Sequence, residues 1–544
     1  MISDEGKGGP DVGTPDEGEN ASRVPISKRL AVINAFSGLA THFVSFGVLL
    51  WANQYLLAHV PPHEMDLLPI VMGVVAFSPL LSVALTAGFG RFVVESYAKS
   101  DDRAISRLVS SATPIFLAVA LIMVVVAAMI CCYADRLLRV PVEYVADVRW
   151  MLGLVFLGIV YRLVANPFSV GLYVCQRHVL QNLILAIGAF MTAALMVVLM
   201  LGMGPRVKYF VMAQFVGTLF NVTCTVFVSC RLVPALRFRR KLIDFSCLKG
   251  VFTFNGWTFV RQVSASLRNG SVPFLLNALS APGQATAFYI GSLADRQLQT
   301  LSVKLFSPLE TPMIAMHAHG NEKGLANAYL RGGRLMLWFV MLVATPLAVL
   351  ATECVNLYSH GNVPDAAVVL LISMLLFPIR SSNGMLGPLV HAQARPDLLA
   401  RVILLTDLCV LCVSVMLILA TGWGAAAVAV ATGICVLVLH PLFWWRLGRK
   451  LAKVSFYDWM MQTFVPGMVP ACVSACTLVL VKQARLIDTW AELFAAGAIG
   501  MTAYLIALLP SLRPIDRRDL ADVWHSIRQR LIGPTTTAVA ASDR

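Results

Sequence analysis

Long apolar runs dominate the chain, and short polar segments separate them. Fourteen runs can be counted, most of about 20 residues or more, the length that a helix needs to cross about 30 Å of hydrocarbon. Their approximate limits are 31–57, 67–90, 109–132, 149–174, 179–203, 208–230, 250–277, 284–308, 333–352, 365–391, 398–420, 424–445, 462–481 and 490–511. The pattern predicts an all-α polytopic membrane protein with about 14 transmembrane helices.

Composition agrees with this prediction. Of 544 residues, 58% are hydrophobic and 13% are charged, and the mean hydropathy is +0.75. A soluble domain carries about 25% charged residues, so this chain has too few of them to cover a surface that faces water. No short apolar segment with a cleavage site precedes the first run, and we therefore expect the first helix itself to direct insertion.

The basic residues predict the orientation. If the N-terminus is cytoplasmic, 29 of the 43 Lys and Arg residues fall in cytoplasmic segments and 7 in periplasmic loops. Basic residues collect in cytoplasmic loops, so both termini are predicted inside. Loops with Arg103, Arg239 and Arg449 are then cytoplasmic, and loops around His63 and Gly361 are periplasmic. This topology accounts for the net charge of +14 without nucleic-acid binding.

The two ends of the chain differ from its centre. Residues 1–24 are acidic and rich in Gly and Pro, which is typical of a disordered tail. In "DLADVWHSIRQRLIG" the apolar residues share one helical face: Leu520, Val523, Trp524, Ile527 and Leu531. This spacing predicts a cytoplasmic amphipathic helix over 515–533, either on the membrane surface or docked on cytoplasmic loops.

The sequence contains no motif for common enzymatic chemistry. It has no GxxxxGK[ST] phosphate loop, no HExxH and no GxSxG elbow, and its twelve cysteines show no paired CxxC motifs with metal spacing. Its longest loops, of about 20 residues, are too short for an extramembrane sugar-donor domain. We therefore expect a transporter, not an enzyme, and no metal or other cofactor.

The run at 250–277 contains two arginines in a stretch that should be apolar. In "NGWTFVRQVSASLRNG", the residues Trp257, Arg261, Ser264 and Arg268 form one stripe of a helix. Each arginine near the bilayer centre costs about 2.5–3.5 kcal/mol on insertion scales. The stripe must therefore face protein or a water-filled cavity.

The next helix has a matching polar stripe around Asp295, with Arg296 beside it. If the two helices are antiparallel, Asp295 falls at a depth between Arg261 and Arg268. A structural ion pair between these helices is one interpretation. Arginines in other predicted helices exceed the nearby carboxylates, Asp295 and Asp407, and this excess favours an anionic substrate such as phosphate or pyrophosphate. The predicted substrate-binding residues are Arg162, Arg261, Arg268, Asp295, Arg296 and Arg380.

Three stretches together resemble one family of transporters. They are "LTAGFGRFVVESYAKSDDRAISRLVSSA" (85–112), "ATAFYIGSLADRQLQTLSVKLFSPLETPMIAMHAHGNEKGL" (285–325) and "QARPDLLARVILLTDLCVLCVSVMLILATGWGAAAVAVATGI" (393–434). Their content and order resemble the polysaccharide branch of the multidrug/oligosaccharidyl-lipid/polysaccharide exporter superfamily, the O-antigen and lipopolysaccharide biosynthesis flippases.

The resemblance implies two six-helix lobes, 28–231 and 250–447, around a central cavity that opens alternately to either side. Helices over 460–511 are then additional. It further implies that the protein flips a lipid-linked pyrophosphate oligosaccharide across the bacterial inner membrane for polysaccharide or lipopolysaccharide biosynthesis. The implied partners are the membrane, this substrate and polysaccharide assembly enzymes.

Two other functions stay open from the sequence. A multidrug or cation antiporter of the same superfamily would typically carry carboxylates in the first and seventh helices. Here the first helix has no Asp or Glu, and the seventh has arginines instead. A membrane scaffold that does not transport is the second alternative, although unpaired buried charge is costly to retain without a use.

Overall fold

The computed structural model describes residues 28–86, 89–138, 140–175, 177–306, 309–393, 395–484, 487–512 and 516. Helices make up almost all of these residues, and no strand occurs among them. The acidic tail predicted at 1–24 and the amphipathic helix predicted over 515–533, except Asp516, lie outside the described residues. The all-α prediction is confirmed.

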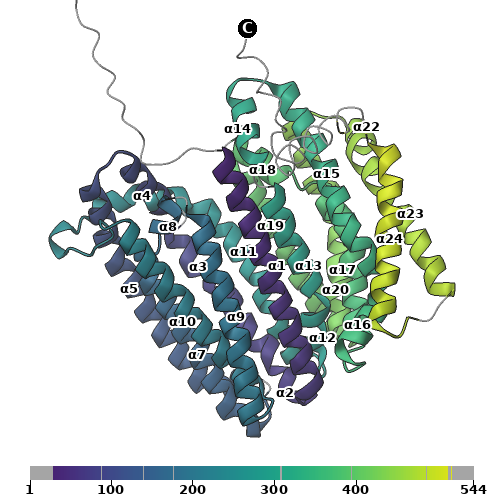
Figure 1. Cartoon of the computed structure of the whole chain (residues 1–544), viewed down its shortest axis with the longest axis horizontal. Helices are drawn as coiled ribbons and strands as arrows, with labels where there is room; N and C mark the ends of the chain where they lie inside the picture. Colours follow the sequence, from purple (N-terminus) through teal and green to yellow (C-terminus); the bar gives the residue numbers. More distant parts are fainter. Residues whose placement is uncertain are drawn as a thin grey trace, which may run out of the picture.

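The described residues of the first half form ten α-helices, most of which are labelled in Figure 1. They are α1 (Lys28–His59), α2 (Pro62–Met65), α3 (Leu67–Thr86), α4 (Phe89–Ala98), α5 (Asp102–Cys132), α6 (Ala134–Leu137), α7 (Val145–Ala165), α8 (Gly171–Val174), α9 (His178–Met203) and α10 (Val207–Leu232). Short 3₁₀ segments are η1 (Val142–Tyr144), η2 (Asn166–Phe168), η3 (Arg240–Leu242) and η4 (Phe245–Leu248).

The second half begins with the long α11, and the last two long helices, α23 and α24, lie at its outer edge (Figure 1). Its helices are α11 (Lys249–Leu279), α12 (Gln284–Gly291), α13 (Leu293–Phe306), α14 (Glu310–Ala318), α15 (Glu322–Val349), α16 (Ala351–Ser359), α17 (Asp365–Ser381), α18 (Leu386–Ala392), α19 (Pro396–Thr421), α20 (Ala425–Leu439), α21 (Arg446–Ala452), α22 (Phe456–Trp459), α23 (Val465–Ala484) and α24 (Trp490–Ser511). Two π-helical turns are η6 (His440–Trp445) and η7 (Met460–Phe464).

Ten helices in the described residues are long and apolar enough to cross a membrane. They comprise α5, the α7 region, α9, α10, α15, α17–α18, α19, α20–α21, α22–α23 and α24. Helices also cover the other four predicted runs, as α1, α3, α11 and the pair α12–α13. The chain is therefore a multi-pass membrane protein, and the number of fourteen crossings stays a prediction.

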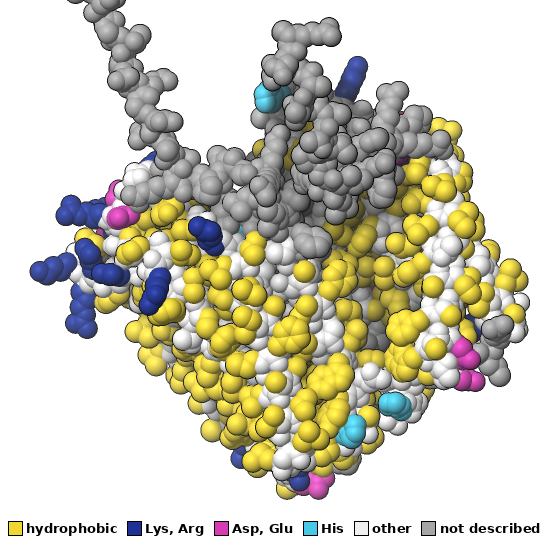
Figure 2. Space-filling model, in the orientation of Figure 1, with side chains coloured by type: hydrophobic (Ala, Val, Ile, Leu, Met, Phe, Trp, Pro, Cys, Tyr) yellow, Lys and Arg dark blue, Asp and Glu magenta, His cyan; other side chains and the backbone are white. Residues whose placement is uncertain are grey.

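The loops that the charge pattern assigns to one side of the membrane lie at the same end of the molecule. The backbone N–H of Arg239 donates to Ser110 Oγ at 2.8 Å, which joins the α10–α11 connection to α5. At the opposite end, Asn362 Nδ2 donates to the carbonyl of Leu57 at 3.2 Å. Figure 2 shows Lys and Arg side chains gathered at the upper end, above a surface that is largely hydrophobic. The charge asymmetry of the sequence is thus an asymmetry of the folded molecule.

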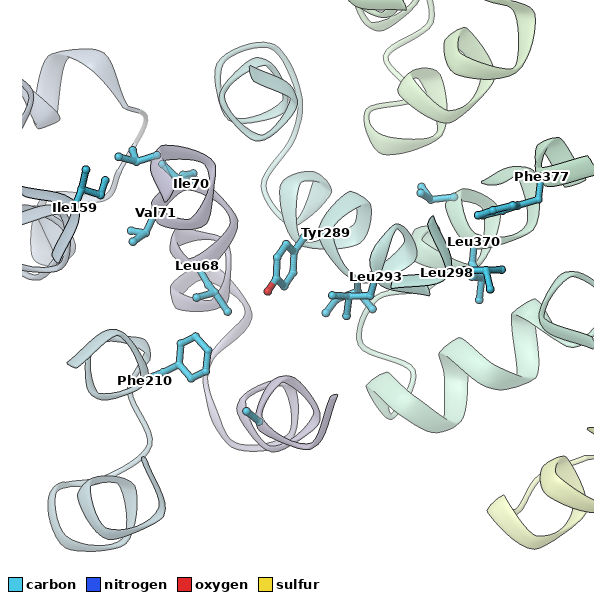
Figure 3. Packing of buried hydrophobic residues seen from close by; sticks show 14 of the residues in the cluster. Leu68, Ile70, Val71, Ile159, Phe210, Tyr289, Leu293, Leu298, Leu370 and Phe377 are labelled. Atoms are coloured by element: carbon cyan, nitrogen blue, oxygen red, sulfur yellow. The ribbon is translucent and has the colours of Figure 1, made fainter. Parts of the chain in front are cut away.

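The two halves pack closely along α3 and α11. A Cβ atom on Gly270 would lie 2.4 Å from Cε2 of Phe77, and one on Gly73 would lie 3.1 Å from the carbonyl oxygen of Gly270. A larger residue at position 270 would push these helices apart. The hydrophobic core continues across the contact, with Tyr289 of α12 between Leu68 of α3 and Leu293 of α13 (Figure 3).

Hydrogen bonds also join the halves at the end predicted to be periplasmic. The carboxylate of Asp66, between α2 and α3, accepts from the backbone N–H of Gly283 and from Thr286 Oγ1, the latter at 2.7 Å. The hydroxyl of Tyr358 donates to the carbonyl of Leu50 at 2.8 Å. These contacts connect α1 and α3 to α12 and α16.

The last two helices are attached to the second half through α15. Trp338 Nε1 donates to the carbonyl of Pro466 at 2.9 Å, and the Tyr504 hydroxyl donates to the carbonyl of Trp338 at 3.0 Å. Arg334 forms a buried ion pair with Asp516 at 2.7 Å. Arg331 of α15 pairs with the same carboxylate at 2.9 Å, so Asp516 joins two arginines of α15.

Candidate functional site

Four of the six predicted site residues lie around one pocket in the second half of the molecule. This pocket, here named the C-terminal pocket, has a volume of about 80 Å³ and lies among α11, α12, α13, α17, α19 and α20. The predicted residues that line it are Arg268, Asp295, Arg296 and Arg380. Its other polar lining residues are Asn269, Ser292, Gln299, Ser373 and Thr432.

Two ion pairs hold arginines in this pocket. Arg380 of α17 pairs with Asp295 of α13, whose other carboxylate oxygen accepts from Gln299 Nε2 at 3.1 Å. Arg268 of α11 pairs with Asp407 of α19, with 3.2 Å between Nη1 and Oδ1. The Asp407 side chain is 4% exposed, so its charge depends on this partner.

Arg296 is held differently. Its Nη2 donates to the backbone carbonyl of Tyr289 at 2.9 Å, and its guanidinium lies 4.9 Å from the centre of the Tyr289 ring. These contacts orient the cation without neutralising it. The three arginines of the pocket, together with Asp295 and Asp407, therefore carry a formal charge of +1.

Some hydrogen-bonding capacity in and beside the pocket is unused. Arg380 Nε and Asp407 Oδ2 are buried and have no hydrogen-bond partner within the described part of the protein. The ring of His440, which follows α20, is also buried, stacks on Trp444 at 4.8 Å and leaves Nδ1 without such a partner. Buried polar groups are normally satisfied, and a cluster of exceptions is typical of a functional site.

The other two predicted residues lie elsewhere. Arg261 is exposed on α11 and does not line the C-terminal pocket. Arg162 of α7 lines a separate pocket of about 130 Å³ among α3, α7 and α10. Neither forms an ion pair within the described residues.

One interpretation of the sequence, a structural ion pair between Asp295 and the arginines of α11, is wrong. Asp295 pairs with Arg380, and the stripe on α11 meets α19 instead. Arg268 pairs with Asp407 there, and Arg401 stacks over Trp257 at 5.4 Å. The sequence gives the helical face of each charge but not which neighbouring helix that face meets.

A second cavity was not predicted from the sequence. This N-terminal cavity, of about 450 Å³, lies between α1, α9 and α10, and Lys304 of α13 completes its wall. Its polar residues recur at helical spacing on each helix: Thr41, His42 and Ser45 on α1, Asn182 and Thr192 on α9, and Gln214, Thr218 and Asn221 on α10. This periodicity is present in the sequence, but neutral polar residues are common in membrane helices and do not by themselves indicate a binding site.

No group of three or more His, Cys, Asp or Glu side chains in the described residues is placed to hold a metal ion. The C-terminal pocket and the N-terminal cavity are lined by apolar residues, hydrogen-bonding groups, cationic groups and the carboxylate of Asp295.

Comparison with known proteins shows which folds this chain resembles. The chain is 20% identical over 481 residues to the Uncharacterized membrane protein EpsK of Bacillus subtilis (strain 168), covering 87% of this chain and 94% of that protein. The structure of a lipid II flippase MurJ in an inward closed conformation superimposes with a TM-score of 0.65 at 14% identity, covering 91% of this chain and all of that one. No family model matches the sequence.

A multidrug resistance MATE family transporter of the MOP superfamily, in an inward-facing conformation, gives a TM-score of 0.57 at 14% identity. It covers 77% of this chain and 99% of its own. The chain thus has the polytopic fold of these MurJ and MATE structures, and the predicted resemblance is confirmed at the level of the fold. These neighbours are transporters and flippases rather than enzymes.

Proposed function

We propose that the protein flips a lipid-linked pyrophosphate oligosaccharide across the bacterial inner membrane by alternating access, for polysaccharide or lipopolysaccharide biosynthesis. The observation that carries the proposal is the C-terminal pocket with its three arginines. Guanidinium groups bind phosphate oxygens through paired hydrogen bonds, and a low-dielectric site strengthens that contact. Arg296, which has no carboxylate partner at ion-pair distance among the described residues, is the first candidate for this contact.

The ion pairs give the pocket a way to exchange partners. Asp295 and Asp407 keep Arg380 and Arg268 in place while the substrate is absent. An entering pyrophosphate group would compete for the same guanidinium hydrogens. Both pairs join different helices, so exchange alters contacts between α11 and α19 and between α13 and α17. This exchange would link substrate binding to helix movement.

A cation antiporter with the same fold is the alternative function. Its substrate would approach a pocket whose two carboxylates already pair with arginines and whose formal charge is positive. Coulombic repulsion in a low-dielectric site would oppose binding. The charge of the C-terminal pocket therefore favours an anionic substrate.

Deletion and complementation test the proposed function. In a strain without the chromosomal gene, we expect undecaprenyl-pyrophosphate-linked oligosaccharide to accumulate in the inner membrane and surface polysaccharide to fall. A plasmid copy of the wild type should reverse both changes. The two quantities are measured by lipid extraction with mass spectrometry and by immunoblot. Unchanged lipid-linked oligosaccharide in the deletion strain would overturn the proposal.

A further inference from the structure

The N-terminal cavity has a polar lining that is chemically distinct from that of the C-terminal pocket. Hydroxyl and amide groups from α1, α9 and α10 dominate its polar residues; among the described residues, its titratable groups are His42 and Lys304, and neither an arginine nor a carboxylate lines it. Hydroxyls and amides both donate and accept hydrogen bonds. A lining of this kind suits a ligand that also offers donors and acceptors in close alternation and carries no net charge.

Several of these groups have capacity to spare. Gln214 and Ser45 form no side-chain hydrogen bond within the described residues. The hydroxyls of Thr218 and Thr192 donate to carbonyls of their own helices at 2.9 Å, which leaves their lone pairs able to accept. Asn221 packs against Gly188, and a Cβ atom on Gly188 would lie 2.2 Å from Oδ1 of Asn221. Helices α9 and α10 thus approach closely while presenting polar groups to the cavity.

Polar groups in membrane helices are costly when no partner satisfies them. Gln214, Thr218 and Asn221 recur at i, i+4 and i+7 on α10, so one face of that helix points into the cavity. Apolar residues alternate with them around the wall, including Val48, Leu49, Leu185 and Met196. A sugar ring matches such a wall, since its hydroxyls point outwards and its C–H faces are apolar.

The dimensions and position of the cavity are also suitable. A volume of about 450 Å³ falls in the range of small-molecule sites, roughly 300–1,000 Å³. Lys304 reaches the cavity from α13, so the second half of the molecule completes the wall. A ligand in the cavity would contact both halves.

We propose that the N-terminal cavity binds uncharged sugar rings of the transported glycan, with Gln214 and Ser45 as hydrogen-bonding residues. The inference rests on the proposed function, in which the C-terminal pocket holds the anionic group of the same molecule. Each half of the protein then recognises a different part of the substrate: hydroxyls in one cavity and phosphate oxygens in the other.

The test compares two probes on the purified full chain by native mass spectrometry: undecaprenyl pyrophosphate, and undecaprenyl pyrophosphate linked to N-acetylglucosamine. The wild type should bind the glycosylated probe about tenfold more tightly, the effect of one or two hydrogen bonds. Gln214→Leu with Ser45→Ala should remove this difference and leave affinity for the bare lipid unchanged. Gln262→Leu, a change in α11 that lines neither cavity, should preserve the difference.

Each outcome has a defined meaning. If the double variant keeps the sugar-dependent gain, or loses affinity for both probes equally, the cavity is not a sugar site. Ser45→Ala is also measured alone, because it removes one oxygen atom and leaves folding intact. If the wild type binds the bare lipid but gains nothing from the sugar, only this inference is overturned. If the wild type binds neither probe, the proposed function is overturned as well.

Discussion

The two halves of the molecule solve the problem of polar groups in a membrane differently. The C-terminal pocket contains three arginines, two of which are paired with aspartates from other helices. The N-terminal cavity is larger, and its polar lining residues are mainly amides and hydroxyls, beside His42 and Lys304. Charged groups need dedicated partners in low dielectric, whereas neutral groups can satisfy themselves on their own helix. In the proposed function, the charged and the neutral parts of the substrate are recognised at separate sites.

The largest expected effect comes from Arg296, which has no carboxylate partner at ion-pair distance within the described residues. Arg296→Ala should reduce the clearance of lipid-linked oligosaccharide about 100-fold in the complemented deletion strain, because a charge-assisted contact contributes roughly 1.5–3 kcal/mol. Arg296→Lys should recover part of the rate, since an ammonium retains the charge but lacks the planar fork. Protein amounts are matched by immunoblot. Wild-type clearance by Arg296→Ala would place anion recognition elsewhere.

The next prediction separates bracing from binding at the Arg380–Asp295 pair. Asp295→Ala leaves Arg380 without its partner and should destabilise the protein by about 3 kcal/mol, which would lower its amount in the membrane. Removing Arg380 as well should restore the amount but not transport. Accumulation is measured by fluorescence of a tagged protein, and transport by surface polysaccharide. Full transport by the double variant would show that the pair is structural.

Much of the fold was predictable because its cause is local. Each apolar run is long enough for a bilayer, and helices occupy all fourteen predicted runs. The interruptions between helices were less predictable. The eighth run is divided between α12 and α13 at Ser292, and the separate helix α14 precedes α15. Such breaks depend on neighbouring helices that satisfy the freed backbone groups, and no local pattern reveals them.

The candidate site was predicted in part. The cost of buried charge selected Arg268, Asp295, Arg296 and Arg380, which the fold brings to one pocket. The same criterion also selected Arg162 and Arg261, which lie away from that pocket. The free-energy cost of inserting an arginine into the bilayer shows that its side chain must avoid lipid. It does not show which internal surface that side chain contacts. That choice depends on helix packing.

The two arginines on α11 provide an internal comparison in which the expected losses of transport are smaller. Arg268 lines the C-terminal pocket and Arg261, seven residues earlier, does not. Arg268→Ala should lower transport about tenfold, because it removes a guanidinium and leaves the buried Asp407 unpaired. Arg261→Ala should change transport less than twofold, within the usual effect of exposed charges. Surface polysaccharide at equal protein amounts reports both. An equal loss of transport in the two variants would show that both arginines of α11 contribute to substrate binding.

The smallest expected effect concerns Arg162 in the first half. It lines a pocket that shares Gln214 and Thr218 with the N-terminal cavity, and it has no ion pair within the described residues. Because it lines a pocket separate from the C-terminal pocket, its contribution to anion binding should be long-range and weak. Arg162→Gln should weaken binding of bare and glycosylated undecaprenyl pyrophosphate equally, by about threefold at low salt.

The salt dependence distinguishes this attraction from direct contact. At about 0.5 M salt the Debye length falls to roughly 4 Å, and the loss caused by Arg162→Gln should then disappear. Arg162→Lys should match the wild type at every salt concentration, because charge alone is required. Losses from Arg296→Ala should persist in salt, since a direct hydrogen bond in a pocket is screened much less. If Arg162→Gln instead costs more than Arg296→Ala at high salt, the anionic group binds in the first half, and the division between the two cavities is reversed.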